Sequence, residues 1–434
     1  MNRFRKNVWV TVLFVMIVIM VVYPGSILCK TNRVSKTPAH SKAKAPEKGK
    51  AAQDGPAPSG GLQCDARSAI LMDGATGQVL FEQSANQRIA PASFVKVMTL
   101  YVVLDTIRAG KLKLDDMVTV SEKAWKRTYK TTSSSMFLKV GDRVKVEDLI
   151  KGVAIASGND ACVALAEHVS GSEEAFVSKM NEKAKLVGLK DTQFRNTDGM
   201  PAADQYTTAA DIATLAKRYI EDHPEALAYH STVEFEYNGI RQGNRNTLLQ
   251  KNIGVDGLKT GHVQEAGYHL VATARRDGQR MIAVVMGCNK MNKRGPEAQK
   301  LLEYGFKNFS TVEAVKKGTT FGPLKVKRGK VDQVSLTAGE SAKVTVAKGK
   351  ENSVSAVPQL PPFIVAPIQK DQVLAKVLVQ NEGKVVKEVN LLASSNVEKS
   401  FIPPWPILVG ILLGAVVIAA LAFWWLRRPK TKRL

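Results

Sequence analysis

The 434-residue sequence is poor in cysteine, histidine and acidic residues, and these scarcities exclude several classes of protein. Its four cysteines are scattered, without a Cys-x-x-Cys pair, and its six histidines form no cluster with them. A zinc site or a redox dithiol needs such closely spaced ligands. We therefore expect no metal and no cofactor, and we expect Cys162, within a helical apolar run, to be a small buried hydrophobic residue.

The shortage of acidic residues leaves the chain strongly basic. Against 62 lysines and arginines there are 39 aspartates and glutamates, for a formal net charge of +23. A basic excess can attract nucleic acid, but no nucleic-acid-binding motif accompanies it here. Both ends of the chain also carry signals for export or membrane insertion, so no nucleic-acid partner is expected.

Long apolar runs occur only near the two ends. Residues 8–23 follow a basic start, as in a secretory signal, but no clear small-residue cleavage site follows them. Residues 1–29 are therefore predicted to be a signal peptide or an N-terminal membrane anchor. Within residues 405–426, the apolar run 407–426 would span ~30 Å as a helix, is edged by tryptophans and precedes a basic tail, 427–434. This pattern predicts a transmembrane helix with a cytoplasmic tail.

Composition divides the rest of the chain into three regions. Residues 30–61 are rich in Lys, Ala, Pro and Ser and predict a disordered linker. In residues 62–310, helical patterns lie between early and late groups of strand-like runs, which predicts an α+β domain whose first and last strands meet in an antiparallel sheet beside a helical cluster. Short alternating runs in residues 311–395 predict a small all-β sandwich, followed by a linker, 396–404.

A reactive pair is predicted at the start of the helical pattern at residues 94–110. Ser93 and Lys96 stand three residues apart, so the lysine can reach the serine hydroxyl from the same helix face. Apolar neighbours disfavour the charged form of a lysine, which lets it act as a base toward the serine. Alone, this spacing is weak evidence, because it recurs by chance in any basic protein.

Two further motifs make a chance match improbable. Ser157-Gly158-Asn159 lies between two helical patterns, and Lys259-Thr260-Gly261 ends a strand-like run at residues 255–259. The three motifs in this order are the signature of serine β-lactamases and penicillin-binding proteins. The stretches SGNDACVALAEHVSG, NTDGMP, YTTAADIATLAK, NRNTLL and VDGLKTGHVQEAGYHLVATA narrow this further. Residues 66–309 resemble the low-molecular-mass D-alanyl-D-alanine carboxypeptidases, a group of penicillin-binding proteins.

The resemblance implies a β-lactamase/transpeptidase-like fold for the α+β domain and a role for each motif residue. Ser93 would be the nucleophile that forms the acyl-enzyme, Lys96 the general base and Ser157 the proton relay. Asn159 would bond the substrate amide and brace Lys96. Lys259 would be both catalytic and substrate-binding. The implied substrate-binding residues are Lys259, Thr260, Gly261, His262, Arg294 and Arg245, with the backbone N–H groups of Ser93 and His262 as oxyanion donors. Arg245 could equally be a surface arginine.

The implied partners follow from the same resemblance. They are peptidoglycan pentapeptides ending in D-Ala-D-Ala, β-lactams as covalent inhibitors, and the membrane through the C-terminal helix. The implied location is the bacterial inner membrane, with the catalytic domain on the periplasmic side. Carboxypeptidases of this group usually end in an amphipathic surface helix, so a spanning helix is a departure in anchoring.

Four alternatives are weighed against this interpretation. Serine β-lactamases with a deacylating glutamate carry a Glu-x-x-Leu-Asn-type loop, and no such stretch lies between Asn159 and Lys259. A non-catalytic wall-binding scaffold would not need every reactive side chain. Endopeptidase cleavage of cross-linked D-alanyl bonds stays open. A Ser-His-Asp triad through His262 is disfavoured, because Lys96 already supplies the base.

Overall fold

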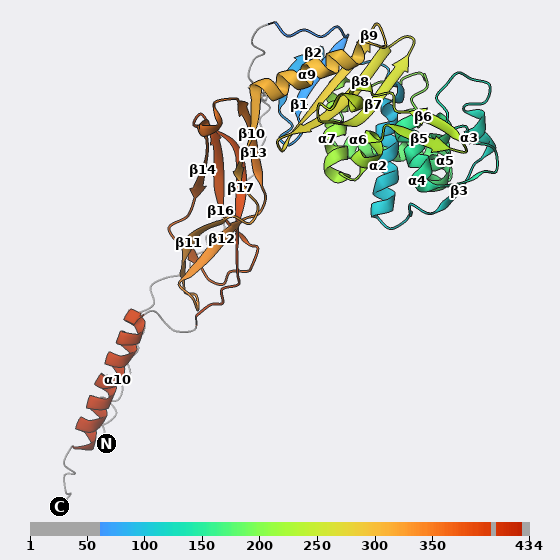
Figure 1. The fold of residues 1–434 in the computed structure, drawn as a ribbon. Coiled ribbons are helices and arrows are strands. Elements are labelled where there is room, and N and C mark those ends of the chain that lie inside the picture. Colours follow the sequence, from blue (N-terminus) through green and yellow to red (C-terminus); the bar gives the residue numbers. More distant parts are fainter. Residues whose placement is uncertain (1–60, 401–404, 428–434) are drawn as a thin grey trace, which may run out of the picture. The chain divides into compact units, whose positions relative to one another are not determined.

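The computed structural model describes residues 61–400 and 405–427. The predicted signal or anchor at 1–29, nearly all of the linker at 30–61 and the basic tail lie outside these residues. The described chain forms an α+β domain, an all-β domain and a separate C-terminal helix, each taken by itself below (Figure 1).

A five-stranded antiparallel sheet forms the centre of the α+β domain, in the order β2-β1-β9-β8-β7. Its strands are β1 (Ser68–Asp73), β2 (Val79–Gln83), β7 (Val255–Val263), β8 (Gly267–Arg276) and β9 (Gln279–Cys288). The first strand pairs with the last, with Ile70 opposite Val284, so the predicted meeting of early and late strands is confirmed.

Strand β7 is longer than predicted. The sequence pattern ended it at Lys259, but its pairing with β8 continues to Val263 opposite Gly267. The prediction was wrong because Gly261 has weak strand propensity, while the register with β8 gives the backbone groups of Thr260 and Gly261 partners. The Lys-Thr-Gly motif therefore lies within an edge strand of the sheet.

Helices cover both faces of the sheet. Helix α9 (Arg294–Asn308) packs on β9 and β8, whereas α7 (Ala209–Asp222) packs against β9 and β1 from the helical side (Figure 1). All six residues of β1 are buried. Burial on both faces explains why the central strands read as continuous apolar runs rather than alternating ones.

The helical cluster surrounds α2 (Val95–Arg108), which is buried at every position from Val95 to Leu104. The predicted helices appear as α4 (Val146–Lys151), α5 (Asn159–Ser170) and α6 (Glu173–Leu186), with a π-helical turn at Gly152–Ala156 after α4. Several short elements escaped prediction because they are too short to show a period: β3 (Met117–Thr119), α3 (Glu122–Lys126), β4 (Arg143–Lys145), α8 (Ala226–Ser231), β5 (Glu234–Tyr237) and β6 (Ile240–Gly243).

The all-β domain has its own core, which includes Leu336, Val377 and Leu391. It contains a two-stranded sheet of β10 (Phe309–Val315) and β13 (Ala342–Ala347). A six-stranded sheet is formed by β14 (Val354–Gln359), β16 (Val373–Asn381), β17 (Lys384–Ala393), β12 (Gln333–Ala338), β11 (Thr320–Lys327) and β15 (Ile364–Val365). Helix α10 (Trp405–Leu426) has 22 residues and a mean hydropathy of 2.8 over its most apolar stretch, which is long and apolar enough to cross a membrane.

Candidate active site

Ser93 and Lys96 lie together where the chain enters α2. Ser93 is the middle residue of a 3-10 turn, Ala92–Phe94, and Lys96 belongs to the first turn of the α-helix that follows. The Lys96 Nζ is 3.1 Å from the Ser93 Oγ, within hydrogen-bonding distance. The three-residue spacing thus brings the two groups together locally, as the sequence predicts.

The surroundings of Lys96 favour its neutral form. Its side chain is fully buried, and this burial lowers the pKa of Lys96 below its ordinary value, with Arg245 and Arg127 adding to the effect. Its ammonium nitrogen also bonds the backbone carbonyl of Asp198. Among the described residues, no hydrogen bond joins Lys96 to the Asn159 carboxamide. The bracing role that the resemblance implies for Asn159 stays a prediction.

Ser157 also contacts the Ser93 hydroxyl. It follows the π-helical turn and has a left-handed backbone, with φ of 62° and ψ of 33°. Its hydroxyl donates a hydrogen bond of 3.2 Å to the Ser93 Oγ. A left-handed non-glycine residue costs about 1–3 kcal/mol, and such strain persists only where neighbouring structure enforces it. The Ser93 oxygen therefore lies between two polar groups from different elements.

Packing explains why position 158 is a glycine, where the general signature has aspartate. A Cβ on Gly158 would lie 2.9 Å from Asp160 Oδ1 and 3.1 Å from the backbone nitrogen of Met136. The buried Asp160 carboxylate accepts bonds from Ser135 Oγ at 2.7 Å and from Met136 N at 2.9 Å. This network fixes the loop across the cleft and leaves no room for a side chain at 158.

Four basic side chains, those of Lys96, Lys259, Arg245 and Arg294, lie near one another beside the serines. Lys259 on β7 is buried, and this burial, with the nearby charges of Lys96, Arg245 and Arg294, holds the pKa of Lys259 well below its ordinary value. Arg294, at the start of α9, donates to the carbonyl of Arg245 at 3.3 Å. No described carboxylate forms an ion pair with Lys259, Arg245 or Arg294. The cluster is therefore suited to an anionic ligand.

Arg245 lies at the mouth of this cluster. Its guanidinium Nη1 donates to the Ser134 hydroxyl at 2.5 Å, and the main chain of Ser134 in turn accepts a bond of 2.9 Å from the Asn159 N–H. Arg245 is thus exposed and contacts the loop beside the site residues, and its role in substrate binding stays a prediction.

The Thr260–His262 stretch of β7 runs along the nucleophile turn. A Cβ on Gly261 would lie 3.2 Å from Ala92 Cβ and 3.4 Å from the Ser93 nitrogen, so the two backbones are close. The His262 ring is exposed and stacks on Tyr268, with ring centroids 4.1 Å apart. Lys96, and not His262, is the basic group in contact with Ser93.

Two contacts that sequence reasoning missed shape the nucleophile turn. Gly199 has a φ of +84°, and a Cβ there would lie 1.8 Å from the carbonyl oxygen of Ala92. The stretch NTDGMP that contains it was noted only as part of the resemblance. Its glycine is the signal that was available, because glycine permits both a left-handed backbone and close approach.

The second missed residue is His269 on β8. It is buried, with Nε2 3.1 Å from the Ala90 carbonyl and Nδ1 2.9 Å from the Gly287 N–H. These partners require a neutral ring protonated on Nε2, and burial lowers the pKa of His269 to about 4. The ring centroid is 5.6 Å from that of Phe94, next to the nucleophile. No local pattern marks this residue, because its partners are distant in the sequence.

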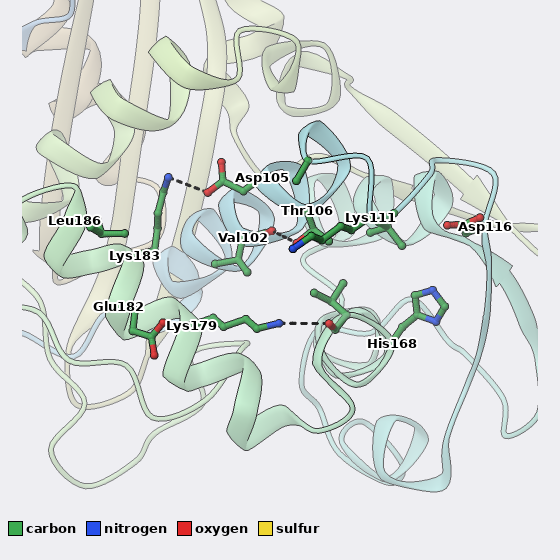
Figure 2. A pocket seen from close by; sticks show the side chains of 13 residues that line it. Val102, Asp105, Thr106, Lys111, Asp116, His168, Lys179, Glu182, Lys183 and Leu186 are labelled. Atoms are coloured by element: carbon green, nitrogen blue, oxygen red, sulfur yellow. Dashed lines mark hydrogen bonds and ion pairs between the residues drawn. The ribbon is translucent and has the colours of Figure 1, made fainter.

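A hollow of about 410 Å³ near the other end of α2 contains none of the predicted site residues. Figure 2 shows Asp105, Lys179, Glu182 and Lys183 among the side chains that line it. Two of its three lysines have partners: Lys183 pairs with Asp105 at 2.8 Å, and Lys179 donates to the Val169 carbonyl at 3.5 Å. Acidic side chains also line this hollow, so its positive charge is balanced, unlike that of the basic side chains beside Ser93.

Three described cysteines are free and buried: Cys64, Cys162 and Cys288. Burial raises the pKa of Cys162 to about 12, so its thiol is unreactive despite lying near Lys96. The described residues include no group of three or more potential metal ligands.

Comparison with known proteins decides the family. A family model described as D-alanyl-D-alanine carboxypeptidase matches residues 51–290, more than half of the chain. The chain belongs to the D-alanyl-D-alanine carboxypeptidase family. A second model, described as the C-terminal domain of penicillin-binding protein 5, matches residues 309–399 of this carboxypeptidase.

Individual relatives agree with this assignment. D-alanyl-D-alanine carboxypeptidase DacC of Escherichia coli (strain K12) is 45% identical over 339 residues, covering 77% of this chain and 85% of that protein. Penicillin-binding protein 5 from Haemophilus influenzae is similar in structure, with a TM-score of 0.72 and 40% identity over 78% of this chain and 99% of that one. Penicillin-binding protein D2 from Listeria monocytogenes, solved in a cefotaxime-bound form, has a TM-score of 0.53 and 30% identity over 57% of this chain and all of that one. The predicted family, fold and serine carboxypeptidase activity are confirmed.

Proposed function

We propose that this carboxypeptidase removes the terminal D-alanine from peptidoglycan pentapeptide stems through an acyl-enzyme on Ser93. The observation that carries the proposal is the position of the Ser93 Oγ, 3.1 Å from Lys96 Nζ and 3.2 Å from Ser157 Oγ, beside an uncompensated cluster of cations. A nucleophile, a base and an anion site together suit attack on a peptide that ends in a free carboxylate.

In the first step, Ser93 attacks the carbonyl of the penultimate D-alanine while neutral Lys96 takes its proton. The backbone N–H groups of Ser93 and His262 stabilise the oxyanion, because β7 runs close beside the nucleophile turn. Ser157 passes a proton to the leaving amine, and the peptide bond breaks. Asn159 bonds the substrate amide. Terminal D-alanine leaves, and the remaining stem stays on Ser93 as an ester.

The carboxylate of the terminal D-alanine binds the cationic cluster. Lys259 and Thr260 hold it from β7, with Arg294 and Arg245 as guanidinium partners whose fork geometry matches a carboxylate. Anion binding relieves the repulsion between buried cations, so the cluster gives the site its preference for a free C-terminus.

In the second step, water hydrolyses the ester and restores Ser93. A β-lactam acylates the same serine, but its leaving amine stays tethered to the acyl group. With no deacylating glutamate of the β-lactamase type in the sequence, we expect slow release of bound penicillin. The cefotaxime-bound relative supports β-lactam binding at this site.

The membrane anchor belongs to the same proposal. The length and hydropathy of α10 support a spanning helix, and the basic residues after it favour a cytoplasmic tail. The catalytic domain then lies on the periplasmic side of the bacterial inner membrane, where the predicted N-terminal signal would deliver it.

The test uses the full-length protein in nanodiscs with a muramyl pentapeptide ending in D-Ala-D-Ala, beside a Ser93→Ala control. Release of D-alanine that depends on Ser93 is the expected result. If no D-alanine is released but penicillin still acylates Ser93, the result would favour an endopeptidase or transpeptidase activity. Absence of both would favour a non-catalytic scaffold.

A further inference from the structure

A hollow of about 370 Å³ lies beyond the C-terminal end of β7, next to the nucleophile turn. Ala90 and Pro91 line it on the side that leads to Ser93. Val263 and Glu265 line it from the end of β7 and the turn that follows. The loop at residues 199–205 completes the wall. None of the residues given a role in the reaction lines this hollow.

The direction of the substrate along β7 leads to this hollow. Because β7 is an edge strand, an extended peptide can pair with it. The cations near Lys259 hold the C-terminal carboxylate, so the rest of the stem runs the other way, toward Val263. The reacting carbonyl belongs to the penultimate D-alanine and lies level with the His262 N–H, which stabilises its oxyanion. One residue of strand advances about 3.3 Å. The residue before D-Ala-D-Ala therefore lies near Val263, which lines the hollow.

The lining of the hollow indicates the chemistry of its occupant. Its walls are mostly alanine, proline and valine, and Glu265 is the one charged residue that lines it. Glu265 is exposed and forms no ion pair or hydrogen bond with another described residue. This hollow therefore has a single, unpaired negative charge among mostly apolar walls. It suits an aliphatic chain that ends in a positive group.

We propose that this hollow is a subsite for the side chain of the residue that precedes D-Ala-D-Ala, and that Glu265 selects an ammonium group at the end of that side chain. The inference rests on the proposed function, since it takes its direction from carboxylate binding at the cationic cluster. Glu265 is exposed, so we expect a preference of about threefold to fivefold, the upper range for a solvent-accessible ion pair.

The test compares three peptides that differ only at this residue: lysine, Nε-acetyl-lysine and norleucine. The kcat/KM for D-alanine release is measured with the full-length protein. We expect the lysine peptide to be favoured through a lower KM. Glu265→Gln should remove this preference without changing the rate on the norleucine peptide, and Glu265→Lys should reverse it. Glu182→Gln, at the separate hollow shown in Figure 2, is the matched control and should keep the preference for the lysine peptide.

Equal rates on the three peptides in the unmodified protein would overturn the subsite, as would a lysine preference that survives in Glu265→Gln. If no peptide releases D-alanine, the proposed function fails separately. The three peptides are then compared as competitors of penicillin, by the concentration of each peptide that halves the rate of acylation of Ser93. A lower concentration for the lysine peptide, lost in Glu265→Gln, supports the subsite. Equal concentrations for the three peptides refute it.

Discussion

The hydroxyl oxygens of Ser93 and Ser157 lie 3.2 Å apart, although 64 residues separate the two serines in the chain. Lys96 contacts the same Ser93 oxygen from within its own helix. The nucleophile therefore has one polar neighbour from its own turn and one from the loop before α5. This separation lets one group take the proton of Ser93 while another delivers a proton to the leaving amine.

Replacing Ser157 should impair acylation without unfolding the protein. Ser157→Gly removes the hydroxyl and tolerates the left-handed backbone, so its melting temperature should stay near that of the unmodified protein. General acid–base groups contribute roughly 10²–10⁴-fold, and a loss in that range is expected in the rate of penicillin acylation. Wild-type acylation by Ser157→Gly would contradict the relay role.

The pH profile of acylation should report Lys96. A base must be neutral, and burial lowers the pKa of Lys96, so the rate should rise with pH through this lowered pKa and level off below pH 10.5, the ordinary value for lysine. Lys96→Arg keeps the charge and cannot lose it, so acylation should fall by about 10²-fold or more. A profile of unchanged shape in Lys96→Ala would show that another group is the base.

Arg294 should affect binding of peptides with a free C-terminus. Hydrogen bonds to charged groups contribute about 1.5–3 kcal/mol, so Arg294→Ala should raise the KM of a D-Ala-D-Ala peptide by roughly tenfold to a hundredfold. A C-terminally amidated peptide should bind Arg294→Ala and the unmodified protein alike. Arg241→Ala, on the exposed hairpin of β5 and β6, is the control and should leave KM unchanged. An unchanged KM in Arg294→Ala would contradict the assignment of Arg294 as a carboxylate-binding residue.

His269 should act as a positioning residue for the nucleophile turn. His269→Phe keeps a buried ring but loses the bonds to the Ala90 carbonyl and the Gly287 N–H. We expect the acylation rate to fall about tenfold while reversible β-lactam binding changes little, because the turn that carries Ser93 loses its tether. His223→Phe is matched, since His223 is also buried and hydrogen-bonded, but its partners Asp105 and Arg108 lie at the opposite end of α2 from the nucleophile turn. Equal losses in both variants would indicate a merely structural role.

His269 should also make the protein sensitive to acid. Its folded pKa of about 4 lies below the ordinary 6.5, so the unfolded chain takes up the proton first as pH falls. This contribution to stability is complete above about pH 6.5 and is lost as pH falls toward 4, on the order of 3 kcal/mol. Denaturant unfolding at several pH values should show a shallower acid slope in His269→Phe than in the unmodified protein. Identical slopes would contradict the burial argument.

The sequence by itself determined those features that depend on near neighbours in the chain. Helix geometry places residues three apart on one face, so the contact between Ser93 and Lys96 was readable from spacing. Periodic apolar patterns located α2, α5 and α6, and continuous apolar runs located the buried strands β8 and β9 and the helix α10.

The tertiary structure decided what depends on packing between distant segments. It brought Ser157 to Ser93, set the Asp198 carbonyl against Lys96, extended β7 to Val263 and tethered the nucleophile turn through His269. The cluster of cations around Lys259 also draws on separate elements. These contacts join backbone and side chains tens to hundreds of residues apart, and only the packing of the sheet against its helices sets such distances.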